Sequence, residues 1–195
     1  MTQADVIIWD FETLEIKHRM KLHKVAINSI CFSPNEKYVI TAGGQDDNTL
    51  VVWDTESGKA VAGTPAMGET INEVKFFNNS NNKLISVHNG CVRLWDLDVE
   101  RKKITPTLVN LGNVKRNIIN VIVDPSDLFA FCGTKTGDFL EINLERANFK
   151  RLGPLKRLFS LAILTINQLP NGDIIVGTGE GVIAKIGRRD FKIKG

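Results

Sequence analysis

The residues of this sequence that could do chemistry are few, and they lie in short turns. Asp46 and Asp47 stand side by side in the stretch GGQDDNTLVVWD at residues 43–54. Paired carboxylates can work as acid and base or bind a metal, but such sites need further groups that converge on the pair and perturb its pKa values. Asp is also a frequent turn residue in its own right. We therefore interpret the pair as part of a turn.

Two other stretches carry suggestive residue types. GTGEG at 177–181 is similar to a dinucleotide-binding glycine loop, but that loop must open a helix, and here the β-rich run VIAKIG follows. His88 and Cys91 supply two ligand atoms, whereas a zinc ion usually takes four. A Ser-His-Asp triad is assembled in space, so the sequence does not exclude one, but no motif indicates it. We expect no enzyme activity, no metal and no cofactor.

Composition favours an ordinary intracellular protein. The 195 residues fit one domain, and 43% hydrophobic residues can build a core. The balance of 25 basic and 22 acidic side chains gives a net charge of +3, which is far below that of a dedicated nucleic-acid binder. The three cysteines show no CxxC pairing and are typical of reduced thiols. The N-terminus does not resemble a signal peptide, and no apolar run is long enough to span a membrane.

A repeated unit organises the chain. The dipeptide Trp-Asp closes a short β-rich run three times, at Trp9-Asp10, Trp53-Asp54 and Trp95-Asp96, with spacings of 44 and 42 residues. Two degenerate copies, DFLEIN and VIAKIG, end at residues 143 and 187 and continue the period with spacings of 47 and 44. Five copies at a nearly constant period predict five copies of one structural unit.

Turn residues recur at the same place in each unit. Gly90, Gly137 and Gly181 precede the third β run, where a tight hairpin requires a backbone that glycine adopts without penalty. In the stretch 43–54, Asp47 and Asn48 fill this turn. Further β runs lie before and after, and no segment has the period of an amphipathic helix. Each unit is therefore predicted to be four short antiparallel strands.

Four strands in about 40–45 residues, with Trp-Asp closing the third, resemble the blades of WD-repeat β-propellers. The resemblance implies an all-β, incomplete arc of about four and a half four-stranded antiparallel blades. It also implies a hydrogen-bonded tetrad of His23, Thr41, Asp47 and Trp53 in the best copy, with Asp46 as a possible substitute for Asp47. The expected blade bounds are 1–21 (partial), 22–64, 65–110, 111–154 and 155–195.

A closer resemblance covers almost the whole chain. The stretches ADVIIWD, FSPNEKYVITAGGQDDNTLVVWD, VRLWDLDVERKKITPT and GTKTGDFLEINLERANFKRLGP resemble the cilia- and flagella-associated protein 52 family. That resemblance implies a microtubule inner protein of the ciliary or flagellar axoneme, which binds tubulin and other inner proteins on the luminal wall of doublet microtubules. A generic WD-repeat adaptor that binds peptide partners in a cytoplasmic complex is the alternative.

The length and the loop charges carry two further expectations. An arc of about four and a half blades leaves strand edges open, so we expect the remaining blades of the propeller to come from a longer chain. Basic pairs lie in two of the connections between blades, and side by side they would form a basic strip that attracts an acidic filament. Ordinary solvated loop residues are the alternative interpretation. The strip residues are Lys115, Arg116, Lys156 and Arg157.

Overall fold

The described part of the chain consists of short strands joined by turns and loops. The computed structural model describes residues 4–155 and 158–194, and in these ranges it contains seventeen strands and no helix. The strands form five separate sheets in which consecutive strands pair antiparallel, with two, four, four, four and three strands in chain order. The predicted all-β class and the alternation of short antiparallel strands are confirmed.

The strand bounds follow the repeat. The first sheet contains β1 (Asp5–Trp9) and β2 (Ile16–Lys21), and the second β3 (Ile27–Phe32), β4 (Tyr38–Gly43), β5 (Thr49–Asp54) and β6 (Ala60–Pro65). The third contains β7 (Ile71–Phe76), β8 (Lys83–His88), β9 (Val92–Asp98) and β10 (Lys103–Leu108). The fourth contains β11 (Ile118–Val123), β12 (Phe129–Thr134), β13 (Phe139–Asn143) and β14 (Asn148–Gly153). The fifth contains β15 (Ile163–Gln168), β16 (Ile174–Thr178) and β17 (Ile183–Ile186).

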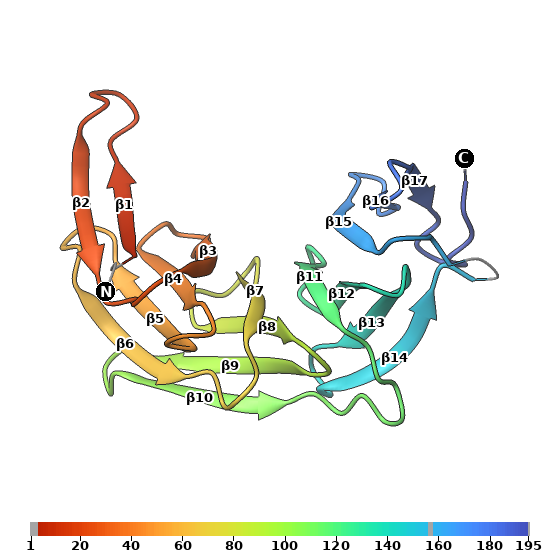
Figure 1. Ribbon diagram of the computed structural model, residues 1–195, viewed down its shortest axis with the longest axis horizontal. Helices are drawn as coiled ribbons and strands as arrows, with labels where there is room; N and C mark the ends of the chain where they lie inside the picture. The colour runs from red at the N-terminus through yellow and green to blue at the C-terminus, as the bar shows by residue number, and fades with distance from the viewer. Residues whose placement is uncertain (1–3, 156–157, 195) are drawn as a thin grey trace.

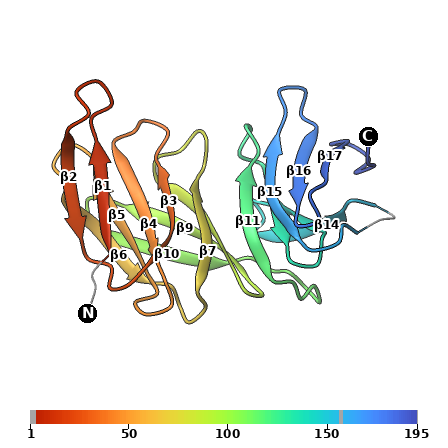
Figure 2. The same ribbon diagram turned by 45° about the horizontal axis from the view of Figure 1, so that its top comes forward.

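The sheets stand side by side as the blades of an open propeller arc. Figure 1 shows β3, β7, β11 and β15 along the concave side and β6, β10 and β14 along the convex side. The hairpin of β1 and β2 lies at one end of the arc and the sheet of β15–β17 at the other, which both views show (Figures 1 and 2). The predicted incomplete propeller arc is confirmed, while the exact blade bounds stay a prediction.

The last blade differs from expectation. The sequence FKIKG predicts a fourth strand after β17, but within the described residues this segment forms only an isolated bridge between Ile186 and Ile193. The backbone turns instead, because Phe191 N donates to the carbonyl oxygen of Gly187 and Gly187 N donates to that of Lys192, both at 2.8 Å. An alternating pattern of five residues is too short to exclude such a turn.

The hydrophobic core lies between blades. All six residues of β4, YVITAG, are buried, because the neighbouring blades cover both faces of this central strand. Ile40, Leu50 and Val52 pack in one cluster with Ile71 and Val74 of the next blade. Inner strand β3 instead alternates half-buried and exposed residues, as expected for a strand with one solvated face.

Asparagine side chains hold consecutive inner strands together. At three successive junctions an amide Nδ2 of one inner strand donates to a backbone carbonyl oxygen at the start of the next inner strand. The pairs are Asn28 to Ile71 at 3.0 Å, Asn72 to Ile118 at 2.6 Å and Asn120 to Ile163 at 2.7 Å. Because each bond satisfies a carbonyl group at the blade edge, it fixes how one blade sits against the next.

Candidate functional site

The predicted tetrad residues lie in one chain of hydrogen bonds. His23 comes from the connection between β2 and β3, Thr41 from β4, Asp47 from the β4–β5 turn and Trp53 from β5. The indole Nε1 of Trp53 donates to Thr41 Oγ1 at 2.9 Å, and Thr41 Oγ1 lies 2.7 Å from His23 Nε2. His23 Nδ1 lies 3.0 Å from Asp47 Oδ2. Every group is satisfied when Nδ1–H donates to the carboxylate and the hydroxyl donates to Nε2.

This network fastens a turn to the blade interior. Asp47 Oδ2 also accepts the backbone N–H of Lys24 at 2.8 Å, whereas Asp46 is exposed and takes no part. A Cβ added at Gly43 would lie 1.7 Å from Asp47 Oδ1, so glycine is required here by close approach rather than by φ. The carboxylate, the imidazole and the β4–β5 turn are thus positioned together.

Asp47, His23 and Thr41 have the group types of a catalytic triad, yet they cannot work as one. Both His23 and Thr41 are completely buried, and the Thr41 hydroxyl is already bonded to the Trp53 indole. A nucleophilic hydroxyl must reach the scissile atom of a substrate. The arrangement can therefore hold a turn but cannot attack a substrate.

The next blade contains a related network that sequence reasoning missed. Trp95 Nε1 donates to Ser86 Oγ at 2.7 Å, and Ser86 Oγ lies 2.7 Å from His88 Nε2. His88 Nδ1 lies 3.1 Å from the carbonyl oxygen of Glu69. His88 is close to Cys91 in sequence, as a metal ligand could be, but its ring nitrogens face Ser86 and Glu69 instead.

The two imidazoles reach equivalent places from different parts of the chain. In the strand register Gly43 lies opposite Ile27, and His88 lies opposite Ile71, so His88 occupies the position of Gly43. In one blade Gly43 has no side chain here, and the imidazole of His23 reaches this place from the connection between β2 and β3. The other blade places the imidazole on the strand itself. The exchange of glycine for histidine between aligned repeats is the sequence signal that could have revealed this network.

Burial makes His88 sensitive to pH. Burial away from water lowers the pKa of His88 from 6.5 to about 4. The positive charge of Arg93 also lowers this pKa, whereas the hydrogen bond to the Glu69 carbonyl raises it. The unfolded chain therefore binds more protons than the folded chain between these values, and the free energy of unfolding falls as pH falls from 6.5 towards 4, by up to about 3 kcal/mol.

Urea unfolding of the chain and of its His88→Gln variant across this pH range checks the prediction. The wild-type free energy of unfolding should fall more steeply than that of the variant below pH 6.5, and the difference should level off near pH 4. Parallel pH profiles for the two proteins would contradict the assignment of this titration to His88.

The third complete blade has an ion pair beside the turn between β12 and β13, in place of a histidine network. Arg116 Nε lies 2.8 Å from Asp138 Oδ2, and the Thr134 hydroxyl donates to Asp138 Oδ1. Asp138 is 1% exposed. Arg116, predicted for the basic strip, therefore pairs within its own blade.

The rest of the predicted strip is only partly described. Lys115 is exposed, while Lys156 and Arg157 lie outside the described residues. The strip itself stays a prediction.

The predicted blade markers occupy turns and strand ends. Gly90, Gly137 and Gly181 have φ angles of +86°, +87° and +81°, in the region that favours glycine. Asp10 Oδ1 accepts the backbone N–H groups of Glu12 and Thr13. The backbone bond from Thr13 is the main cause that lowers the pKa of Asp10.

The other Trp-Asp residues differ in their surroundings. Asp54 Oδ1 accepts from both Ser57 N and Ser57 Oγ, and the hydroxyl bond is the main cause that lowers its pKa. Asp96 is exposed. Trp95 is 1% exposed but Trp9 is 58% exposed, because β1 pairs only with β2 and no described strand covers its other edge.

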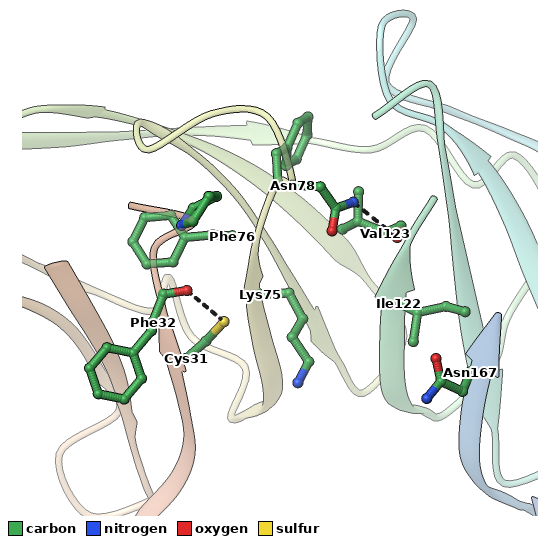
Figure 3. A pocket seen from close by; sticks show the side chains of 10 residues that line it. Cys31, Phe32, Lys75, Phe76, Asn78, Ile122, Val123 and Asn167 are labelled. Atoms are coloured by element: carbon green, nitrogen blue, oxygen red, sulfur yellow. Dashed lines mark hydrogen bonds between the residues drawn. The ribbon is translucent and has the colours of Figure 1, made fainter. Parts of the chain in front are cut away.

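A cavity of about 350 Å³ lies on the concave side (Figure 3). Cys31 and Phe32 enter it from β3, Lys75 from β7, Ile122 from β11 and Asn167 from β15, so four blades contribute. Lys75 Nζ lies 3.1 Å from Glu73 Oε1, so its charge is balanced. The cavity lining mixes aromatic and aliphatic side chains with a lysine and two asparagine amides.

Neither a metal-binding cluster nor a membrane-spanning helix occurs in the described residues. In residues 4–155 and 158–194, no group of three or more His, Cys, Asp and Glu side chains is placed to hold a metal ion. The same ranges hold no helix that is long and apolar enough to cross a membrane.

The chain is similar to known proteins at three levels. Residues 14–54 match the family model described as WD domain, G-beta repeat. The chain is 46% identical to cilia- and flagella-associated protein 52 of Chlamydomonas reinhardtii over 178 residues. This aligned region covers 91% of the chain and 29% of that protein. The human protein of the same name is 36% identical over 184 residues, with 93% and 30% covered. The predicted resemblance is confirmed.

The structural comparison agrees on the fold. The β-propeller domain of Cps50 (Swd1) from Myceliophteria thermophila matches with a TM-score of 0.79 and covers 93% of this chain and 58% of that one. Its sequence identity of 16% supports the fold alone. The chain spans about three tenths of the length of the curated relatives it matches.

Proposed function

We propose that this chain is a structural protein of cilia and flagella. The premise is that it is a WD-repeat β-propeller segment, similar over most of its length to cilia- and flagella-associated protein 52. The chain would act as a microtubule inner protein that binds the luminal wall of axonemal doublet microtubules and stabilises them. The observation that carries the proposal is the 46% identity across 91% of the chain. That span includes blades in which the generic repeat pattern is faint.

The proposed mechanism is rigid contact at several points. The blades are joined by the asparagine bonds between inner strands, and the networks around His23 and His88 position turns within two of the blades. A platform that is already ordered loses little conformational entropy on binding, and several weak contacts on one rigid body add up. Tubulin and other inner proteins are the proposed partners, together with remaining blades from a longer chain.

A scaffold is favoured over an enzyme because the potentially reactive side chains are buried and already bonded to other groups of the chain. The hydroxyls of Thr41 and Ser86 are buried and bonded to indoles, and Asp138 is paired with Arg116. Propellers host many unrelated functions, so the fold by itself does not decide this point.

A peptide-binding adaptor is the second candidate, and one observation favours it. The concave cavity presents Phe32, which is about half exposed, and it is large enough to hold apolar side chains of a bound peptide. Recovery of the chain with a soluble partner, in cells that lack microtubules, would favour the adaptor.

Extraction of isolated axonemes tests the proposed function. Because a luminal protein is enclosed by the tubule wall, the tagged chain should stay with doublets after washing in about 0.5 M salt, where charge interactions at exposed surfaces are strongly screened. It should leave only when the doublets dissolve. A protein of the outer doublet surface serves as the control and should be washed off. Release of the chain by salt alone would contradict the proposal.

A further inference from the structure

The positive charge of the chain is concentrated at the junction between its last two blades. Among the residues that the structure describes, seven cationic side chains and three carboxylates lie around this junction, which leaves an excess of four positive charges there. The whole chain carries +3, so all other residues together carry −1. We call this set the junction patch; it consists of Lys150, Arg151, Lys185, Arg188, Arg189, Lys192 and Lys194 with Glu141, Asp173 and Asp190.

The inner part of the junction patch is fixed by one buried carboxylate. Glu141 is completely buried, and its oxygens lie 2.5 Å from Arg151 Nε, 2.8 Å from Arg188 Nη1 and 3.6 Å from Lys150 Nζ. The guanidinium carbon of Arg151 lies 3.6 Å from the ring centroid of Phe191. Stacked and paired guanidinium groups are held in one orientation, so they lose little freedom when they bind an anion.

A second carboxylate holds two lysines nearby. Asp173 lies 3.1 Å from Lys194 Nζ and 3.3 Å from Lys185 Nζ. The hydrogen bond from Lys194 is the main cause that lowers the pKa of Asp173 to about 2, so this carboxyl stays ionised at neutral pH. One negative charge thus faces two positive ones.

The outer part of the junction patch keeps unbalanced charge. Arg189 and Lys192 are exposed, and in the part of the chain that the structure describes neither side chain lies in an ion pair. Arg189 is fixed at its backbone, because its carbonyl oxygen accepts a hydrogen bond from Arg151 Nη1 at 2.9 Å. Beside them lies a cavity of about 530 Å³, lined by Asn171, Asp173, Arg188, Arg189, Asp190 and Lys194.

We propose that the junction patch binds an acidic polypeptide segment whose Asp or Glu side chains pair with Arg189, Lys192 and Lys194. Arginine presents a planar fork that matches a carboxylate, and the cavity holds a few side chains rather than a long backbone. A nucleic acid would need cations along an extended track, and the rest of the chain carries −1. Binding at the junction patch would not depend on where in the cell the chain resides.

Binding of a labelled peptide tests this proposal. Fluorescence anisotropy with the purified chain and a peptide of about ten glutamates should show binding that weakens as salt rises. The double variant Arg189→Glu, Lys192→Glu should weaken binding at least about tenfold, because attraction becomes repulsion. The matched control is Lys102→Glu, Lys103→Glu, which reverses two exposed cations, one in the turn after β9 and one at the first position of β10, and should change binding less than about twofold.

Several results would overturn the proposal. The first is that the peptide does not bind at low salt, and the second is that both double variants lose affinity equally. The third is that a single-stranded oligonucleotide of equal charge binds more tightly than the peptide and that the junction variant loses this oligonucleotide binding. Circular dichroism must show the β signal of each variant unchanged. If the charge-reversed junction variant does not fold, Arg189→Gln with Lys192→Gln replaces it, and the affinity should then fall about three- to fivefold.

Discussion

Replacing Glu141 by Gln should lower the free energy of unfolding by about 2–4 kcal/mol. Loss of one partner from a buried ion pair costs about 3–5 kcal/mol, and the effect is smaller here because the cations around Glu141 are partly exposed to water. The variant keeps the shape of the side chain but removes the charge that holds Arg151 and Arg188 together. Urea unfolding followed by circular dichroism measures the change.

The control for this substitution is Glu145→Gln. Glu145 is an exposed carboxylate a few residues away, so its substitution should change the free energy of unfolding by no more than about 0.5 kcal/mol. Equal effects at Glu141 and Glu145 would show that the buried carboxylate does not join the last two blades.

Replacing Thr41 by Val should cost about 2–5 kcal/mol. The change keeps the branched shape but removes the hydroxyl that bonds both His23 Nε2 and Trp53 Nε1. Each of these buried groups would be left without a partner, and an unsatisfied buried polar group costs about 1–3 kcal/mol. Urea unfolding of the purified variant measures the loss.

Two further variants define what the Thr41 result means. Thr105→Val on the exposed face of β10 should change the free energy of unfolding by no more than about 0.5 kcal/mol. Ser86→Ala should destabilise the next blade for the same reason as Thr41→Val, because Ser86 bonds both His88 and Trp95. A Thr41→Val protein as stable as the Thr105→Val control would mean that the network does not stabilise the blade.

Local patterns predicted the strands well, because their signals lie close together in the sequence. Trp-Asp marks the end of a third strand, and a turn glycine such as Gly90 or Gly137 lies a few residues before it. Both signals report backbone geometry within one hairpin, so they survive when the rest of the repeat degenerates. The unit of four strands could therefore be predicted even where Trp is replaced, as in β13.

Contacts between distant residues could not be predicted in the same way. His88 occupies the position of Gly43 only in the strand register, which a sequence without aligned strands does not reveal. Glu141 meets Arg188 across two blades, and Arg116 meets Asp138 across a whole hairpin. Basic residues in a loop look alike in sequence whether they face solvent or an internal carboxylate.

The end of the chain shows the limit of short patterns. An alternation of polar and apolar residues after β17 is compatible with a strand, but hydrogen bonds between Gly187 and residues 191–192 close a turn first. That turn also places Arg188 beside Glu141 and Arg189 at the surface. One turn thus explains both why the predicted strand does not form in the described residues and how the junction patch is assembled.

The most direct test of the central claim is a cryo-electron microscopy map of salt-washed ciliary doublets from cells with and without this chain. Our account predicts density that fits the arc of blades against the inner wall of the doublet, and loss of that density when the chain is removed. Identical maps from the two kinds of cell, with the chain recovered in the soluble fraction, would contradict it.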